Sequence, residues 1–184
     1  MTAKIVIISG ACGTGKSTIS KLLAENSPCQ RSVRIHTDDF YEYIKKGYID
    51  PWNDEAGDQN EVVVNAVTAS AKEFLAGGYE VYVDGVIGPW FLEQWLKLAN
   101  EGFDVRYVVL RPDEESTVIR AENREQRKEF PLNEEAVRKM WRMFSELGKY
   151  EANVVDNSNQ TVSESAETIQ KLLEDGRFRI GERL

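Results

Sequence analysis

The sequence Gly-Ala-Cys-Gly-Thr-Gly-Lys-Ser at residues 10–17 constrains this chain more than any other feature. It matches the phosphate-loop pattern G-x-x-x-x-G-K-[ST], in which glycines let backbone N–H groups curl around phosphate oxygens. The apolar run at 5–8 predicts a buried strand before the loop, and residues 16–25 predict a helix after it, whose positive end adds to anion binding. This strand–loop–helix order predicts a site for ATP or GTP with Mg²⁺, and it disfavours a glycine-rich turn that binds nothing.

Each position of this loop has an expected role. Lys16 is expected to reach the β- and γ-phosphates and to act in catalysis, and Ser17 is expected to ligate Mg²⁺. The other residues expected to contribute to nucleotide binding are Gly10, Ala11, Cys12, Gly13, Thr14, Gly15 and Thr18.

Length and charge narrow the class of protein further. At 184 residues the chain is expected to form one domain, residues 1–184, with a proper core. A net charge of −8 argues against broad attraction to nucleic acid or to an anionic membrane, although a local basic site could still hold a small phosphorylated ligand.

A disulfide at Cys12 would distort the phosphate loop, which indicates a reducing compartment. With no signal peptide and no apolar run of membrane-spanning length, a cytoplasmic location is expected.

Short apolar runs alternate with longer amphipathic ones, which predicts an α/β fold with a parallel sheet. The expected strands are residues 4–9, 33–37, 81–84, 105–110 and 152–156. The expected helices are residues 16–25, 39–45, 61–76, 90–100, 114–128, 134–147 and 165–174. Thr161 and Glu164 form a possible capping box before the last helix. Residues 50–60 are expected to form a loop near the site.

Three aspartates follow strand ends, where ligands collect in a doubly wound sheet. One of the adjacent acids Asp38 and Asp39 is expected to orient or deprotonate an acceptor hydroxyl. We assign this catalytic role to Asp38, with Asp39 contacting Mg²⁺ waters or capping the helix that starts there; the alternative is that Asp38 only caps that helix. Asp84 is expected to hold a water on Mg²⁺, or else to be a turn residue, since Asp-Gly is a common turn dipeptide.

Arginines on one helical face predict a lid over the nucleotide. Arg120, Arg124 and Arg127 recur at i, i+4 and i+7, and a break at Pro131 precedes the next helix. A helical lid at about residues 115–135 would bring guanidinium groups to the transferring phosphoryl group, with Arg124 and Arg127 as the catalytic candidates. Arg138 is a weaker candidate. The alternative is a solvated face on which glutamates pair with the arginines.

Aromatic residues that leave the strand ends have two possible roles. Trp52, Trp90, Phe91 and Tyr41 could wall an acceptor pocket, although such side chains more often pack in the core. The sole histidine, His36, is expected to be structural within the second strand.

Taken together, these motifs resemble the small-molecule kinases of the adenylate-kinase-like P-loop group, such as shikimate kinase, gluconate kinase and chloramphenicol phosphotransferase. The resemblance covers about residues 3–175 and rests on the phosphate loop, the acid pair, Asp84, residues 110–112, the arginine helix and residues 154–158. It implies a three-layer P-loop NTPase fold with a five-stranded parallel sheet of order 2-3-1-4-5, helices on both faces and a short helical lid.

The resemblance also implies specific roles. In these relatives an Asp just after the second strand contacts the acceptor hydroxyl, which maps best onto Asp38. Adenine lies between a lid arginine and the loop after the last strand, which implies Arg120 or Arg124 together with Asn157 and Ser158. The implied activity is transfer of the γ-phosphate of ATP, with Mg²⁺, to a hydroxyl of a small molecule. The partner is then that acceptor, with no nucleic acid and no membrane, and the enzyme is a monomer or homodimer.

Other functions stay open. Residues 37–41 also resemble the acid motif of uridine and nicotinamide-riboside kinases, which supports Asp38 and suggests a nucleoside-type acceptor. A zeta-toxin-like kinase acting on a large precursor sugar is a further possibility. From another class, a nucleotide-dependent ATPase or switch would act on a protein partner and would need a water-positioning Gln, for which Gln59 is the candidate.

Overall fold

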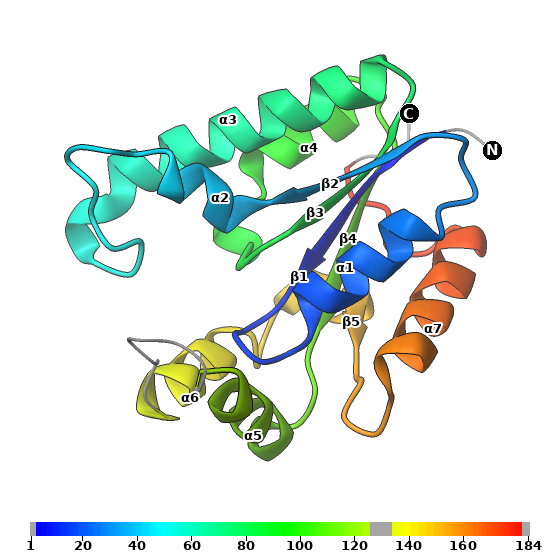
Figure 1. The fold of residues 1–184 in the computed structure, drawn as a ribbon. Helices are drawn as coiled ribbons and strands as arrows, with labels where there is room; N and C mark the ends of the chain where they lie inside the picture. The colour runs from blue at the N-terminus through cyan, green and yellow to red at the C-terminus, as the bar shows by residue number, and fades with distance from the viewer. Residues whose placement is uncertain (1–2, 126–133, 182–184) are drawn as a thin grey trace.

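A five-stranded parallel sheet forms the centre of the protein (Figure 1). The computed structural model describes residues 3–125 and 134–181. The strands are β1 Ile5–Ser9, β2 Ser32–His36, β3 Glu80–Asp84, β4 Val105–Leu110 and β5 Val154–Val155. They lie in the order β2-β3-β1-β4-β5, and all neighbouring pairs are parallel. The P-loop NTPase fold and the strand order expected from the sequence are therefore confirmed.

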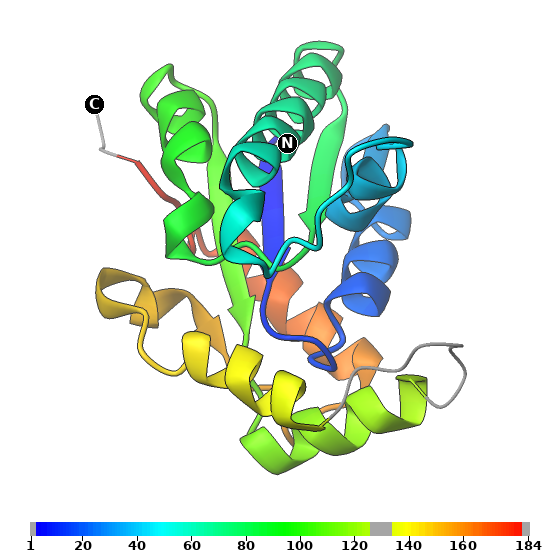
Figure 2. The ribbon, with the colours of Figure 1, turned by 90° about the vertical axis from the view of Figure 1, so that its left-hand side faces the viewer.

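Helices cover both faces of this sheet and one of its edges. They are α1 Lys16–Glu25, α2 Thr37–Glu42, α3 Gly57–Ala76, α4 Glu93–Asn100, α5 Glu114–Glu125, α6 Glu134–Met143 and α7 Val162–Glu174. The helices α3 and α4 pack on one face, and α1 and α7 pack on the other (Figure 1). The helices α5 and α6 cross beyond the carboxyl ends of the strands (Figure 2). Among the described residues, no helix is long and apolar enough to cross a membrane.

The burial of the strands explains their composition. Every residue of β1, β3 and β4 is buried, because helices lie on both faces of the sheet. These strands accordingly read as nearly continuous apolar runs rather than as alternating patterns. The last helix, α7, begins with the capping box expected at Thr161 and Glu164. Local signals and tertiary packing thus agree over most of the chain.

Several expected elements were wrong in extent: the helices expected at 39–45, 90–100, 134–147 and 165–174 have the bounds of α2, α4, α6 and α7. For two further elements the contacts give the reason. The fifth strand has only two residues, because residues Gly148–Asn153 form a 3-10 helix in which the buried Asn153 side chain donates to the carbonyl of Tyr107 at 2.7 Å. The expected loop at 50–60 is shorter, since α3 already begins at Gly57. The polar residues of its first turn hid this helix start, because Gln59 and Asn60 bond to the preceding loop instead of showing an apolar period.

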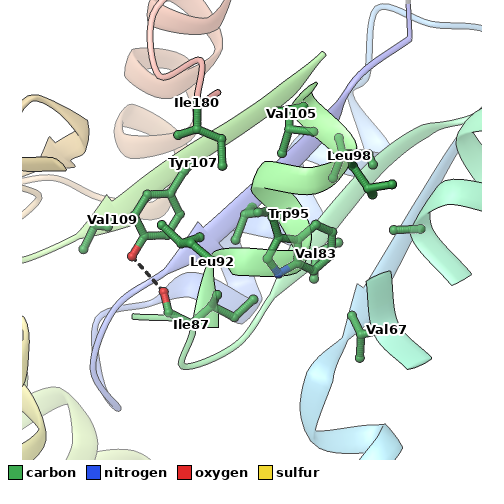
Figure 3. Packing of buried hydrophobic residues seen from close by; sticks show 14 of the residues in the cluster. Val67, Val83, Ile87, Leu92, Trp95, Leu98, Val105, Tyr107, Val109 and Ile180 are labelled. Atoms are coloured by element: carbon green, nitrogen blue, oxygen red, sulfur yellow. Dashed lines mark hydrogen bonds between the residues drawn. The ribbon is translucent and has the colours of Figure 1, made fainter. Parts of the chain in front are cut away.

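The core between α4 and the sheet is built around one large side chain (Figure 3). Trp95 is 1% exposed and lies among Leu92, Leu98 and Val83. Beside it, the buried hydroxyl of Tyr107 donates to the carbonyl of Ile87 at 2.7 Å, so the edge of this cluster holds its polar group without water.

Replacing Trp95 tests how closely this core is packed. Trp95→Ala is expected to lower the free energy of unfolding by about 3–5 kcal/mol, because the cavity it leaves cannot collapse fully. Chemical denaturation followed by circular dichroism measures the change. Trp95→Phe is the matched control and should cost much less, because it keeps a ring and removes an indole N–H that has no partner among the described residues. Equal losses in the two variants would contradict this account.

Candidate active site

The phosphate loop between β1 and α1 has a backbone that only glycine adopts easily at three positions. Gly10, Gly13 and Gly15 have φ angles of 139°, 86° and 91°. A Cβ on Gly10 would lie 2.4 Å from the carbonyl oxygen of Leu110, and one on Gly13 would lie 2.4 Å from that of Thr117. The loop therefore packs tightly against β4 and α5 while its N–H groups curl as a phosphate cradle requires.

Side chains hold this loop in shape from within. Thr14 Oγ1 and Lys16 Nζ both donate to the carbonyl of Ala11, at 2.9 and 3.0 Å. From the loop after β5, Asn157 Nδ2 donates to the carbonyl of Thr14 at 3.1 Å. Ser17 lies partly exposed in the first turn of α1, and Lys16 is 7% exposed. The phosphate-loop residues expected to bind nucleotide are thus held in one conformation by bonds within the loop and from Asn157.

The helices α5 and α6 contact this loop from beyond the sheet edge. The backbone N–H of Cys12 donates to the thioether sulfur of Met140 in α6 at 3.1 Å. Arg120 in α5 donates to the carbonyls of Asn157 and Ser158, at 3.1 and 2.9 Å. The lid arginine and the loop after β5, both expected beside adenine, are therefore in direct contact.

The other arginines expected in the lid are placed differently. Arg138 in α6 forms ion pairs with Glu114, Glu115 and Glu134, so it fits the alternative of a paired, solvated face. The side chain of Arg124 and the whole of Arg127 lie outside the described residues, so their catalytic role stays a prediction.

Asp84 lies at the end of β3 and is buried, with a side chain that is 0% exposed. Its Oδ1 accepts from Ser20 Oγ at 2.6 Å and from Arg34 Nε at 2.7 Å. Its Oδ2 accepts from Arg34 Nη2 at 3.0 Å and lies 2.8 Å from His36 Nδ1. Both oxygens are thus engaged by protein donors, and the metal role expected for Asp84 has no support from these contacts.

Asp38 and Asp39 lie exposed in the first turn of α2, at the carboxyl edge of the sheet. The Asp38 side chain is 64% exposed, and its Oδ2 lies 3.4 Å from His36 Nε2. One turn further along α2, Tyr41 donates from its hydroxyl to Asn60 Oδ1 at 3.0 Å. Asp38 is therefore open to solvent, whereas Tyr41 is bonded to α3.

Electrostatics couple these groups. The hydrogen bond to Asp38, and then that to Asp84, raises the pKa of His36 to about 10, so the ring is charged at neutral pH. Burial raises the pKa of Asp84, but hydrogen bonds from His36, Arg34 and Ser20 outweigh it and hold the pKa well below its usual range. The contact with His36 lowers the pKa of Asp38, and the charge of Lys16 lowers it further. Lys16 and Asp38 thus lie within electrostatic reach of each other.

Two of the aromatic residues expected to wall an acceptor pocket are exposed. Trp52 and Trp90 are 70% and 45% exposed. The loop that carries Trp52 is pinned to α3 by Gln59, whose amide accepts from the N–H of Ile49 at 2.8 Å and donates to its carbonyl at 2.6 Å. An acceptor pocket walled by these rings stays a prediction.

Sequence reasoning missed Arg34, Ser20 and Met140. Arg34 and His36 are two residues apart on β2, a spacing that places both side chains on one face of the strand. That spacing could have pointed to a shared acidic partner. Met140 had no such signal, because its contact with Cys12 depends on how α6 is docked.

The raised pKa of His36 predicts how stability depends on pH. Because the folded protein keeps this proton up to about pH 10 and the unfolded chain loses it near 6.5, the stabilisation is complete below about 6.5 and is lost as the pH rises toward 10. The difference in free energy of unfolding between wild type and His36→Asn should shrink over that window. Urea titrations at several pH values measure it, and a constant difference would contradict the assignment.

The tight packing of Gly13 against α5 predicts that a substitution there weakens ATP binding. Gly13→Ala is expected to weaken ATP binding about tenfold or more, because the new Cβ meets the backbone of α5 and opens the cradle. Gly102→Ala is the matched control, since Gly102 has a φ of 96° but nothing within 4 Å of its added Cβ. Calorimetric titration should show that only the Gly13 variant loses affinity, while both lose about 1 kcal/mol or more of stability.

Known proteins share this architecture. A family model described as AAA domain matches residues 6–140. The tunicamycin resistance protein of Deinococcus radiodurans superposes with a TM-score of 0.64 at 20% identity, over 96% of this chain and 98% of that one. A gluconokinase from Sinorhizobium meliloti 1021 gives 0.61 at 19% identity, over 96% and 97%.

A chain of the Pnkp1/Rnl/Hen1 RNA repair complex gives a TM-score of 0.61 at 22% identity. The match covers 77% of this protein and 44% of the chain from that complex. No curated protein sequence matches significantly. At such identities the structural likeness shows the fold alone.

Proposed function

Because the chain belongs to the AAA-domain family, whose model spans its phosphate loop and α5, we propose that it transfers the γ-phosphate of ATP to a hydroxyl of a small molecule. The observation that carries this proposal is the placement of two groups at one edge of the sheet. Lys16 opens the helix that follows β1 and the phosphate loop, and the exposed carboxylate of Asp38 lies in the first turn of the helix that follows β2. A pure nucleotide-binding site does not need such a carboxylate, whereas a phosphotransferase does.

The residues present fit a nucleotide. The left-handed glycines form a cradle that a Cβ would fill. Asn157 is 2% exposed, and its Oδ1 is a buried acceptor with no hydrogen-bond partner in the described part of the chain. Because an unpaired buried oxygen is costly, this atom suits a donor such as an exocyclic amino group of a base. Arg120, held against the same loop, would flank that base.

In this proposal each residue has a defined task. When bound, MgATP supplies the phosphoryl group and the positive charge that offsets its oxygens. Lys16 and the loop N–H groups bind the phosphates, and Ser17 and Asp39 would hold the metal and its waters. Asp38 accepts a hydrogen bond from the acceptor hydroxyl and orients its oxygen for in-line attack. The helices α5 and α6 exclude water, which would otherwise compete as acceptor.

Asp84 and Gln59 receive structural tasks instead. Asp84 is engaged by Arg34, His36 and Ser20, so we assign it to building the site rather than to the metal. The amide of Gln59 is engaged at both ends by Ile49, which argues against a water-positioning Gln and hence against the switch. A cytoplasmic location and a monomeric or homodimeric state remain predictions.

A panel of hydroxyl compounds tests the activity. ATP consumption would be measured with gluconate, shikimate, uridine, an aminocyclitol, chloramphenicol and tunicamycin, with mass spectrometry to detect an added phosphoryl group. A 5′-hydroxyl oligoribonucleotide belongs in the panel because one structural neighbour is part of an RNA repair complex. One compound that gains a single phosphoryl group supports the proposal, whereas uniform background across the panel contradicts it.

Substitution of the acid pair tests the roles within that reaction. Asp38→Asn should lower kcat for the active acceptor by about 10²- to 10⁴-fold while leaving slow ATP hydrolysis intact, because only acceptor orientation is lost. Asp39→Asn is the matched neighbour and should raise the Mg²⁺ concentration needed for half-maximal rate. Wild-type transfer by the Asp38 variant would show that Asp38 is not the group that orients the acceptor.

A further inference from the structure

Three side chains form a line from the buried sheet to the exposed edge. Asp84 in β3 is 0% exposed, His36 at the end of β2 is 19% exposed, and Asp38 in α2 is 64% exposed. The imidazole ring lies between the two carboxylates, with Nδ1 2.8 Å from Asp84 Oδ2 and Nε2 3.4 Å from Asp38 Oδ2. Because each nitrogen of the ring faces one carboxylate, a ring that is held in place by Asp84 can restrict the rotation of the Asp38 carboxylate.

The inner end of this line is rigid. Asp84 pairs with His36 in the β2–β3 register and is further held by Arg34 and Ser20. Since these contacts come from β2 and α1, the orientation of the carboxylate is set by two elements at once. The ring of His36, bonded to that carboxylate through Nδ1, has its plane defined by the protein core.

The carboxylate of Asp38, at the outer end of this line, has few contacts that restrict its rotation. Asp38 sits on a helix of six residues and is mostly exposed to solvent. Besides the contact with His36, its carboxylate accepts a long hydrogen bond from Thr37 Oγ1, which lies 3.4 Å from Oδ1. An exposed carboxylate rotates freely unless a donor restrains it, and acceptor orientation depends on that angle.

We propose that His36 is a positioning residue for phosphotransfer, which holds the Asp38 carboxylate toward the acceptor hydroxyl and is itself held by Asp84. This role rests on the proposed function, since it requires an acceptor. It differs from a purely structural role, in which His36 would serve only to satisfy the buried Asp84. The two roles use different nitrogens of the ring, and this difference makes them separable.

Two substitutions of His36 by amide side chains test the roles of its Nδ1 and Nε2 atoms separately. The Nδ2 of an asparagine approximates the Nδ1 position of histidine, so His36→Asn keeps a donor for Asp84 and removes the one for Asp38. The Nε2 of a glutamine approximates the Nε2 position, so His36→Gln keeps a donor for Asp38 and weakens the contact with Asp84. Both variants are assayed with MgATP and the panel compound that gives the highest transfer rate.

For a positioning role, His36→Asn lowers kcat by about 10- to 100-fold with little change in the KM for ATP, and His36→Gln recovers most of that loss. The reverse order, with the Gln variant impaired and the Asn variant near wild type, overturns the proposal in favour of the structural role. Equal kcat in wild type and both variants overturns it as well.

A spectroscopic measurement on the folded protein tests the contact without relying on these variants. The chain has one histidine, so the ring ¹⁵N signals of labelled protein belong to His36 without ambiguity. At fixed pH, Asp38→Asn is expected to shift the Nε2 signal much more than the Nδ1 signal. An unchanged Nε2 signal overturns the proposal. If no compound of the panel is phosphorylated, the proposed function fails. The ¹⁵N spectrum does not depend on an acceptor, so it still decides whether His36 contacts Asp38.

Discussion

The buried carboxylate of Asp84 joins the elements on which the candidate site depends. It accepts from Ser20 in α1, the helix that carries the phosphate loop, and from Arg34 and His36 in β2, the strand that carries Asp38 to the edge. Removing one member of such a buried charged group commonly costs about 3–5 kcal/mol, because the other charges are left unpaired. The phosphate loop and the proposed acceptor side, which carries Asp38, are thus placed relative to each other by one charged cluster.

Two further sets of contacts hold the segments around the candidate site. On the nucleotide side, the loop after β5 and the helices α5 and α6 reach the phosphate loop through Asn157 and Met140. On the acceptor side, Gln59 and Asn60 bind the loop that follows α2 to the start of α3. Apolar packing adds to these polar contacts, since Val118 and Ala121 of α5 cluster with Val137 of α6, and Met140 and Trp141 of α6 pack against the main core.

Glycine spacing and apolar runs predicted the phosphate loop and the parallel sheet, because they are local signals that the fold must obey. The strand order was predicted only from the resemblance to small-molecule P-loop kinases. That resemblance also singled out Asn157 and Arg120, which the structure brings into contact. The limits of the fifth strand and of α3 were missed, since Asn153 and Gln59 make long-range side-chain bonds that compete with the local pattern. The metal role predicted for Asp84 rested on its position at a strand end, and nothing in the sequence shows that Ser20, Arg34 and His36 bond to its carboxylate.

By itself, the sequence determined that this chain forms a nucleotide cradle at the edge of a parallel sheet, with acids at neighbouring strand ends. A glycine's conformational freedom and a strand's burial are properties of short segments, so a linear pattern can specify them. Only the tertiary structure decided how those acids divide their tasks. The β2–β3 register places His36 beside Asp84 and leaves Asp38 exposed, and the distinction between a buried, fully bonded carboxylate and an open one exists only once the strands have paired.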